Sequence, residues 1–432
     1  MDYVPSTLEE RQEMLAELGK ASMKELFAQI PDGIMLNRPL GFPDGMSEYE
    51  LMKKMRGIAA KNTIYETVFR GAGAYRHYIP ACVNSLSSRE EFVTAYTPYQ
   101  AEVSQGVLQS IFEYQTAICE LTGMEVSNAS VYDGATAAAE AAIMCLAAKK
   151  VDTLYVSAEI NPQNRAVIET YLNGRNFKLA ELKPELPENS VVYIESPNYF
   201  GKIEDISEIA EKVHDKKGKL IAGVNPISQG LLKSAGECGA DVATGDGQPL
   251  GMPLSFGGPY LGFIAAKKEF IRSLPGRIVG ETVDGNGNRA FVLTLQAREQ
   301  HIRREKASSS ICSNQALCAL RATIYLSAMG PNGLREVAQT CVDGAHYLAA
   351  ELSKIPGFEP VDGSEFFHEF AAAFPENQDM ERFEKRLAEH GILGGLPLGS
   401  NRILWCVTEI ISKEEIDGLI EIIKEFAGEA AF

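Results

Sequence analysis

The sequence has few of the features that mark membrane or nucleic-acid proteins. No run of about 18 apolar residues occurs anywhere in the 432 residues, so no membrane span is expected. The first residues, MDYVPSTLEERQEM, are acidic and polar and lack the apolar stretch of a secretory signal, which favours a cytoplasmic protein. Basic residues number 41 against 58 acidic ones, and the net charge of −17 argues against a nucleic-acid partner.

The cysteines and histidines give no sign of a disulfide framework or a metal site. The eight cysteines are scattered without any CxxC pair, and the six histidines are isolated from one another and from the cysteines. Most of the cysteines stand in apolar text, which is typical of reduced packing residues. Because no metal-ligand spacing occurs, we expect no bound metal. An apolar content of 45% is enough for the large core of an ordinary globular protein.

Residues 1–60 are predicted to form a helical arm. Thr7 and Glu10 have the spacing of a capping box, which indicates a helix start. A connector rich in proline and glycine follows between residues 30 and 43. The arm either lies over a neighbouring surface or caps its own domain, and both interpretations stay open. Further helices are predicted at Met23–Ile30 and Glu48–Ala60.

Helical and strand patterns alternate from residue 61 onward, which predicts an α/β domain with a mostly parallel sheet covered on both faces. We assign residues 61–325 to this large domain. The composition changes near Gly330-Pro331, and residues 326–432 are predicted to form a small C-terminal α+β domain. The helices expected in the large domain are Glu102–Thr122 and Ala135–Lys149, and the strands expected in the two domains are Thr153–Val156, Val191–Glu195, Leu220–Val224, Leu261–Ala265, Glu369–Phe374 and Ile403–Val407.

One loop carries the main functional signal. Residues 241–262 read DVATGDGQPLGMPLSFGGPYLG, which resembles the cofactor-lysine loop of fold-type I pyridoxal phosphate (PLP) enzymes, yet no lysine occurs between Lys233 and Lys267. Gln248 stands at the lysine position, and glutamine cannot bond covalently to the PLP aldehyde. The strand upstream has Ala222 where an acid should face the pyridinium nitrogen, so the ring would be a poor electron sink. This loop predicts a chain that kept the fold and lost the cofactor.

Two further segments have the form of anion sites. Tyr96, Tyr99 and Glu102 precede a helix, whose free N–H groups and dipole favour an anionic ligand. The alternative is that the tyrosines pack at an interface and that Glu102 stabilises the first turn of the helix. The segment Asp133-Gly-Ala-Thr136 resembles a phosphate cup. Because Asp133 adds a negative charge, we interpret this cup as an inherited packing element that binds nothing.

Arginine is concentrated in two segments of this acidic chain, Pro275–Gly280 and Arg298–Arg304. Arginine forks suit carboxylates and phosphates, so these segments could face the active site of a partner or an acidic carrier. Intersubunit ion pairs or a solvated helix face explain the same residues. His301 has no partner that the sequence reveals, and a structural role competes with a catalytic one.

Five stretches, in this order, identify a family that the chain resembles. They are GAGAYRHYIP at 71–80, TAYTPYQAEVSQG at 94–106, DGATAAAE at 133–140, the loop without lysine, and REQHIRR at 298–304. Together they resemble the P-protein of the glycine cleavage system, in the form of the N-terminal-half (alpha) subunit of a split glycine dehydrogenase (decarboxylating).

The resemblance implies a fold-type I subunit that binds no cofactor itself. A homologous subunit 2 would carry PLP, in an αβ or α2β2 assembly. The complex would decarboxylate glycine and pass the aminomethyl group to the lipoamide of H-protein. Tyr96, Tyr99, Glu102 and His301 are then candidates to contribute across the subunit interface.

Two other functions remain. An autonomous PLP enzyme could use Lys233 or Lys267, but neither spacing fits and Ala222 leaves the ring nitrogen without an acid. A structural or regulatory paralogue of a PLP enzyme, with no catalytic partner, is the alternative from another class.

Overall fold

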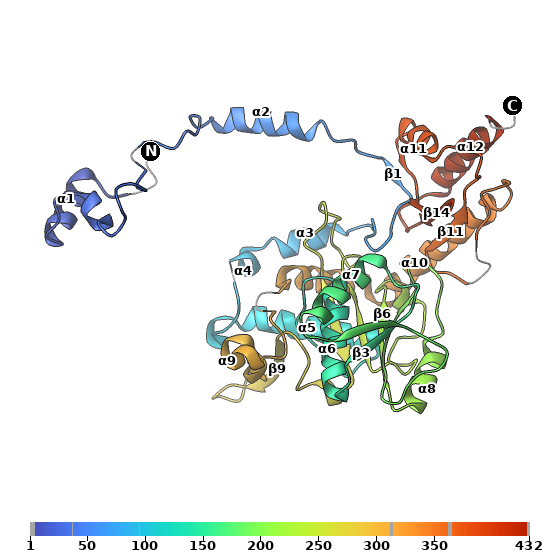
Figure 1. The fold of residues 1–432 in the computed structure, drawn as a ribbon, viewed down its shortest axis with the longest axis horizontal. Helices are drawn as coiled ribbons and strands as arrows, with labels where there is room; N and C mark the ends of the chain where they lie inside the picture. The colour runs from blue at the N-terminus through green and yellow to red at the C-terminus, as the bar shows by residue number, and fades with distance from the viewer. Residues whose placement is uncertain (1–4, 37, 95, 312–313, 362–364, 430–432) are drawn as a thin grey trace. The chain divides into compact units, whose positions relative to one another are not determined.

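The computed structural model describes residues 5–36, 38–94, 96–311, 314–361 and 365–429. The chain divides into two compact units, Met1–Thr63 and Ile64–Phe432, which are described separately (Figure 1). Within the second unit, the predicted domain limit at residue 326 falls inside helix α10 (Ala316–Leu352). The three predicted domains therefore stay a prediction.

The first unit contains two α-helices with matching starts. Helix α1 (Leu8–Glu17) begins after Thr7, whose hydroxyl accepts from the Glu10 N–H while the Glu10 carboxylate accepts from the Thr7 N–H, so the predicted capping box is confirmed. Helix α2 (Glu48–Ala59) starts after Ser47 with the same reciprocal bonds. The second predicted helix is instead a short 3₁₀ turn, η1 (Met23–Phe27), whose N-cap residue Ser22 makes no side-chain capping bond.

This first unit has almost no core of its own. Among its described residues Leu15 alone is buried. Four apolar side chains recur at helical spacing on α2, and each is about half exposed: Leu51, Met52, Met55 and Ile58. Apolar surface of this extent on a short segment marks an interaction surface.

A seven-stranded sheet forms the centre of the second unit. Five of its strands run parallel, whereas β8 is antiparallel to β7 and β2 is antiparallel to β8, so the predicted mostly parallel sheet is confirmed. The spatial order is β2 (Val126–Ser127), β8 (Gly262–Ala266), β7 (Val242–Asp246), β6 (Lys219–Val224), β5 (Val191–Ser196), β3 (Thr153–Val156) and β4 (Lys178–Glu181).

Helices cover both faces of this sheet because the strands are apolar on both sides. On β5, Val192 and Ile194 pack into one core and Val191 and Tyr193 into another. The first core is shared with α5 (Gln105–Thr122), α8 (Ile206–Asp215) and α10, and the second with α6 (Gly134–Lys149) and α7 (Pro162–Asn173). Short helices α3 (Ala81–Ser87) and α4 (Glu90–Val93) precede α5, and the hairpin of β9 (Ile278–Val283) and β10 (Arg289–Thr294) packs on α5.

The C-terminal part contains a smaller sheet. Helix α10 is interrupted at Gly330, which has φ 61° and ψ −179° and is followed by Pro331. Beyond it lie β11 (Glu369–Ala373), β14 (Arg402–Cys406) and β13 (Leu396–Leu398) in one antiparallel sheet, with α11 (Met380–Glu389), α12 (Lys413–Glu429) and β12 (Ile392–Leu393), which pairs with β1 (Thr67–Val68).

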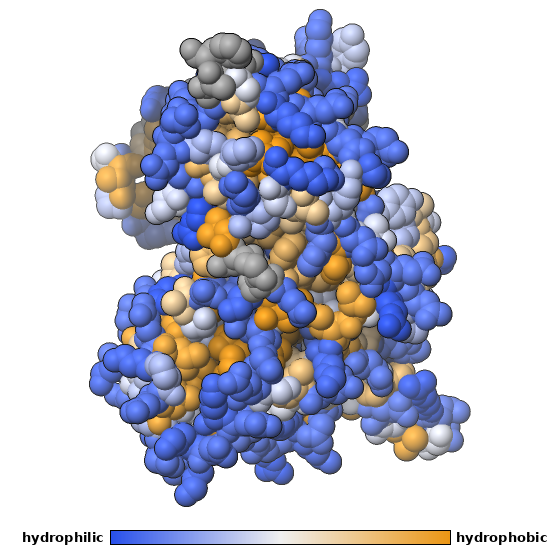
Figure 2. Space-filling view, turned by 90° about the vertical axis from the view of Figure 1, so that its right-hand side faces the viewer, coloured by the Kyte–Doolittle hydropathy of each residue, from blue (hydrophilic) through white to orange (hydrophobic). Residues whose placement is uncertain are grey.

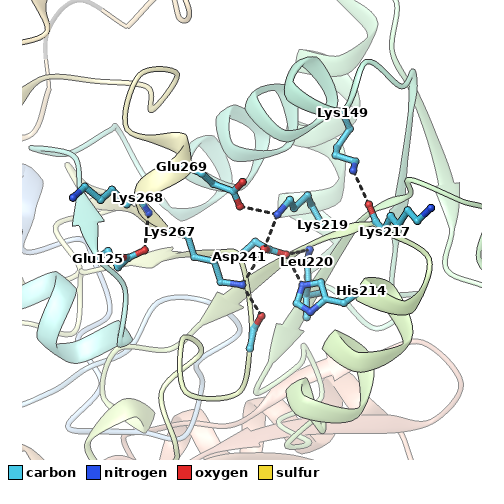
Figure 3. A network of polar contacts seen from close by, with 11 residues as sticks. Glu125, Lys149, His214, Lys217, Lys219, Leu220, Asp241, Lys267, Lys268 and Glu269 are labelled. Atoms are coloured by element: carbon cyan, nitrogen blue, oxygen red, sulfur yellow. Dashed lines mark hydrogen bonds and ion pairs between the residues drawn. The ribbon is translucent and has the colours of Figure 1, made fainter.

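One buried carboxylate ties the strand ends together at the edge of the sheet where β6 and β7 begin (Figure 3). Asp241, 1% exposed, accepts from His214 Nε2 at 2.8 Å, Lys219 Nζ at 3.1 Å and Lys267 Nζ at 3.0 Å. It also accepts from the Leu220 N–H. Although burial opposes the charge, these bonds hold the pKa of Asp241 below its usual value.

The surface and the thiols are those of an ordinary globular protein. The face shown in Figure 2 is mostly hydrophilic, with apolar areas between the polar ones. Within the described ranges, no helix is both long and apolar enough to cross a membrane. The seven described cysteines are free thiols, and Cys312 lies outside the described residues.

A carboxylate-lined cleft and an aromatic cluster

A cavity of about 440 Å³ opens where β5, β6 and β7 end and α6 begins. Open α/β sheets bind their ligands at this edge. The cavity lining comes from the loops that follow these strands and from the segment before α3, chiefly residues 72–75, 133–135, 197–199, 223–226 and 245–246.

Carboxylates dominate the charge of this cleft. Asp133, Glu195, Asp246 and Glu369 line it, and among the described lining residues there is no lysine or arginine. Burial raises the pKa of Asp246 to about 6 and that of Glu369 to about 7, and it raises the pKa of Glu195 as well. The described lining of the cleft therefore offers carboxyl groups and no side-chain cation to an anionic ligand such as a phosphate ester.

Two N–H groups in the first turn of α6 are already bonded to carboxylates. Asp133 caps the helix and accepts from the Thr136 N–H at 2.7 Å, and Asp246 accepts from the Gly134 N–H at 3.0 Å. A phosphate cup works because such N–H groups are free to bind phosphate oxygens. In this chain two of its own carboxylates occupy the Gly134 and Thr136 N–H groups.

Gln248 is bound to the main chain. It is 1% exposed, its Oε1 accepts from the Tyr75 N–H at 2.9 Å, and its Nε2 donates to the carbonyls of Tyr75 and Met252, both at 2.8 Å. Its side chain is not among those that line the cleft. The predicted lysine position thus joins the loop after β7 to the segment before α3.

Ala222, predicted at the position of the acid that faces a pyridinium nitrogen, does not line the cleft, whereas Asn225 does. Ala222 lies in the middle of β6, fully buried in the apolar core, and does not line the cleft. Asn225, just beyond β6, does line it, and its Oδ1 accepts from the Ile227 N–H at 2.9 Å. An amide cannot supply the charge that a pyridinium nitrogen needs. The residues of this cleft do not fit PLP.

A buried polar group lies near the start of α3. His77 Nδ1 is 2.6 Å from Glu409 Oε2, and Cys341 Sγ is 3.5 Å from the same oxygen. These three are the one metal-ligand combination among the described residues. Two ligands of one zinc ion would lie about 3.3 Å apart, given bond lengths near 2.0 Å. The shorter His77–Glu409 distance is that of a hydrogen bond, which joins these segments.

A second set of polar groups gathers beside the β9–β10 hairpin. Tyr99 is about half exposed, and its oxygen accepts from Arg277 Nη2 at 2.9 Å. The rings of Tyr99 and His301 meet edge to face with centroids 6.0 Å apart. Glu299 Oε2 lies 3.7 Å from Arg277 Nε and 3.6 Å from His301 Nδ1. We call Tyr99, Arg277, Glu299 and His301 the aromatic cluster.

The other two candidate residues are on the surface nearby. Tyr96 is 82% exposed, and Glu102 is exposed in the 3₁₀ turn η2 (Ala101–Val103). Helix α5 starts at Gln105 and not at Glu102, so Glu102 precedes the helix instead of lying in its first turn. The aromatic cluster therefore joins Tyr99 and His301 to Arg277 and Glu299, for which no individual role is predicted from the sequence.

Arg298 connects the two arginine-rich segments. Its guanidinium donates to the carbonyls of Leu274, Gly276 and Leu295. Gly276 has φ +84°, and a Cβ there would stand 3.1 Å from Asn128 Nδ2, so this turn favours glycine. The arginines of the two segments thus differ in purpose, because Arg298 holds main chain whereas Arg277 holds a side chain.

Comparisons with known proteins decide the family. The family described as glycine cleavage system P-protein matches residues 1–423. The chain belongs to the glycine cleavage system P-protein family. It is 49% identical over 439 residues to a probable glycine dehydrogenase (decarboxylating) subunit 1 of Moorella thermoacetica, covering 97% of this chain and 98% of the relative. A protein of the same description from Desulfitobacterium hafniense is 48% identical, covering 97% of this chain and 98% of the relative.

Solved structures agree with this P-protein assignment. A crystal structure of glycine decarboxylase (P-protein) of the glycine cleavage system, in an inhibitor-bound form, superposes with a TM-score of 0.92 at 46% identity, covering 99% of this chain and all of that one. A C-DES mutant with glycine linked to its PLP superposes with a TM-score of 0.62 at 14% identity over 86% of this chain and 99% of that one, and so shares the fold alone. The predicted family, fold-type I fold and subunit type are confirmed.

Proposed function

We propose that this P-protein chain is the subunit of a glycine dehydrogenase (decarboxylating) that binds no cofactor. A homologous subunit carries PLP, and the two assemble as αβ or α2β2. The complex decarboxylates glycine and transfers the aminomethyl group to the lipoyl arm of H-protein, in the cytoplasm. In this scheme the present chain forms one wall of an active site whose cofactor belongs to the partner.

The occupied N-terminus of α6 is the observation that carries the proposal. The Gly134 and Thr136 N–H groups, which could bind a phosphate, instead donate to Asp246 and Asp133. Gln248, at the position where a lysine would be needed, is hydrogen-bonded to Tyr75. Each change alone would weaken PLP binding, and the two act at opposite ends of the cofactor. A chain that keeps the P-protein sequence over almost its whole length yet has this cleft needs a partner for catalysis.

The surface of the chain supports assembly. The first unit buries only Leu15 among its described residues, and α2 exposes four apolar side chains. Obligate interfaces are commonly apolar and larger than about 2,000 Å² in total. We therefore expect the isolated chain to self-associate or to be poorly soluble, and to become a defined complex once the partner is present. A stable monomer at high concentration that ignores the partner would contradict this expectation.

The test is reconstitution with the lysine-bearing homologue. Borohydride reduction followed by peptide mapping should find PLP on the partner and none on this chain, because residues 234–266 contain no amine side chain. Exchange of labelled CO₂ into glycine, with H-protein present, should need both chains. PLP attached to a lysine of this chain would overturn the proposal. Full exchange by the partner alone would instead favour a regulatory paralogue.

A further inference from the structure

Arg277 is a buried cation that the fold does not need for its main-chain bonds. The residue is 7% exposed, yet its neighbours are fixed by other groups: Asn128 Nδ2 donates to the Pro275 carbonyl, and the Ala129 N–H donates to the Arg277 carbonyl. Arg298 holds the same turn through Leu274 and Gly276. Burying a guanidinium costs free energy unless hydrogen bonds and opposite charges offset the loss of hydration. The side chain of Arg277 must therefore be explained by what it contacts.

Its main contact is the phenol of Tyr99. Arg277 Nη2 donates to the Tyr99 oxygen at 2.9 Å, and the guanidinium carbon lies 5.3 Å from the ring centroid. Because the phenol oxygen accepts this bond, its own proton is left to donate elsewhere. Tyr99 is 49% exposed. The hydroxyl proton is therefore available to a group outside this chain. A donor bond from a cation also strengthens the donor power of the hydroxyl through cooperativity.

The surroundings suit an anionic acceptor. A pocket of about 620 Å³ lies beside the cluster and shares His301 and Glu299 with it. Its charged lining consists of Arg175, Arg304, Glu299 and Glu305, together with the imidazole of His301. Arginine forks match the oxygens of carboxylates and phosphates. The Glu299 carboxylate is engaged with Arg277 and His301, which leaves two arginines, Arg175 and Arg304, and one carboxylate, Glu305, as the charges open to a ligand.

We propose that Arg277 is a positioning residue that fixes the Tyr99 hydroxyl as a hydrogen-bond donor to an anionic oxygen in the partner's active site. This inference rests on the proposed function. The oxygen belongs either to the carboxylate of glycine or to the phosphate of PLP. The two sources share the same chemistry, and they are separated by whether the affinity for glycine or for PLP changes.

A matched control exists on the β9–β10 hairpin. Arg289 also stacks on an aromatic ring, 4.9 Å from the Phe291 centroid, and it also pairs with a glutamate, Glu281, at 2.7 Å. Its partner ring has no hydroxyl, and the Arg289–Glu281 ion pair is on the surface. Arg289→Met therefore removes a cation stacked on a ring without touching the cluster, and we expect unchanged glycine decarboxylation.

The experiment is a double-mutant cycle in the reconstituted complex. Tyr99→Phe alone should slow labelled CO₂ exchange about 10-fold, because the anionic oxygen loses its donor in a closed site. Arg277→Met should slow exchange by a similar factor. In the Tyr99→Phe background, Arg277→Met should cause no further loss, since the hydroxyl that it positions is absent. Arg277→Lys keeps the buried charge, and it serves if the Met variant fails to assemble.

The outcomes separate this inference from the proposed function. If the native chain with its partner shows no exchange beyond that of the partner alone, the proposed function fails. If the native complex is active and Tyr99→Phe is equally active, the inference fails. Equal losses from the Arg277 change with and without the hydroxyl would make Arg277 merely structural. A raised KM for glycine assigns the carboxylate as acceptor, and a raised Kd for PLP assigns the phosphate.

Discussion

Strand β7 carries an aspartate at each end, and the two are held in opposite ways. Asp241, just before the strand, is surrounded by His214, Lys219 and Lys267, and its pKa is lowered. Asp246, the last residue of the strand, has only main-chain donors in Gly134, Gln248 and Leu261 among the described residues, and burial raises its pKa to about 6.

The difference lies in the partners. Both aspartates leave water, but of the two, within the described ranges, only Asp241 has cations beside it. At the edge with Asp241, cations and a carboxylate tie the strand ends together, whereas the described lining at the opposite edge has carboxylates and no lysine or arginine. The two environments are separated by a strand of five residues.

The largest effect is expected at the Asp241 network, which consists of Asp241, His214, Lys219 and Lys267. Asp241→Ala leaves the ammonium groups of Lys219 and Lys267 and the His214 ring without their carboxylate, and we expect a loss of about 3–5 kcal/mol in the free energy of unfolding. Urea denaturation at low protein concentration measures it. Asp215→Ala, at the exposed end of α8, is the control and should stay within about 0.5 kcal/mol of the native chain. A similarly small loss for Asp241→Ala would mean that the network does not stabilise the fold.

The second effect concerns the lost lysine. Gln248→Lys removes the acceptor of the Tyr75 N–H and buries an ammonium group, so we expect a loss of about 2–4 kcal/mol. The new amine should contact the carbonyls of Tyr75 and Met252 and acquire no PLP, as tested by borohydride reduction. Gln109→Lys, exposed on α5, should be neutral. Stable covalent PLP on the introduced amine would show that the cleft still accepts the cofactor.

The third effect has a sign that depends on pH. Glu369 has a pKa of about 7 in the folded chain, against about 4.3 when unfolded, so the folded chain holds more protons between these values. The contribution of Glu369 to the free energy of unfolding therefore falls as the pH rises through this window and is lowest above pH 7. Glu369→Gln mimics the protonated acid and can still pair with Tyr75. We expect the variant to gain about 1–3 kcal/mol at about pH 8 and nothing at about pH 4.

Denaturation curves between about pH 5 and pH 8.5 measure this gain. Glu421→Gln, exposed on α12, provides a control that should not depend on pH in this range. A gain that is constant with pH would mean that the Glu369 carboxyl does not titrate in the window. Asp241 behaves in the opposite way, because its contribution persists above its unfolded pKa and is lost only as the pH falls through the lower folded value.

The smallest effect is expected from the removal of one lysine of the Asp241 network. Lys267→Met leaves Asp241 with His214, Lys219 and the Leu220 N–H, so we expect a loss of at most about 1 kcal/mol. Unfolding in urea should reveal it beside the Asp241→Ala variant. A loss as large as that of Asp241→Ala would show that Lys219, Lys267 and His214 do not share the carboxylate.

Local signals allowed several elements to be predicted. The Thr7–Glu10 capping box and the alanine-rich helix after Asp133 depend on residues within one turn, and both form as expected. The β9–β10 hairpin was missed although Asp284-Gly285 separates two alternating segments, which is a recognised hairpin signal. Strand β7 lies inside the segment 241–262 that resembles a cofactor-lysine loop, and its sequence VATGD carries glycine and aspartate that are uncommon in strands.

The site was only partly predictable, for reasons of distance along the chain. The absence of lysine at Gln248 is a sequence fact, whereas the contact of Arg277 with Tyr99 joins residues 178 positions apart. The end of β6 at Val224 agrees with the predicted strand, but the sequence does not show that Asn225, just beyond it, lines the cleft while Ala222 is buried in the core. Motif recognition identified the chemistry, and tertiary packing decided which side chains meet.

Gln248 also affects how the chain can evolve. Glutamine and lysine codons differ by a single nucleotide, so mutation alone offers a frequent route back to a lysine at this position. The returning amine would leave the Tyr75 N–H without its acceptor, although it could still donate to the carbonyls of Tyr75 and Met252. Selection for stability would therefore act against this lysine. The three hydrogen bonds of Gln248 thus oppose the return of a lysine at this position.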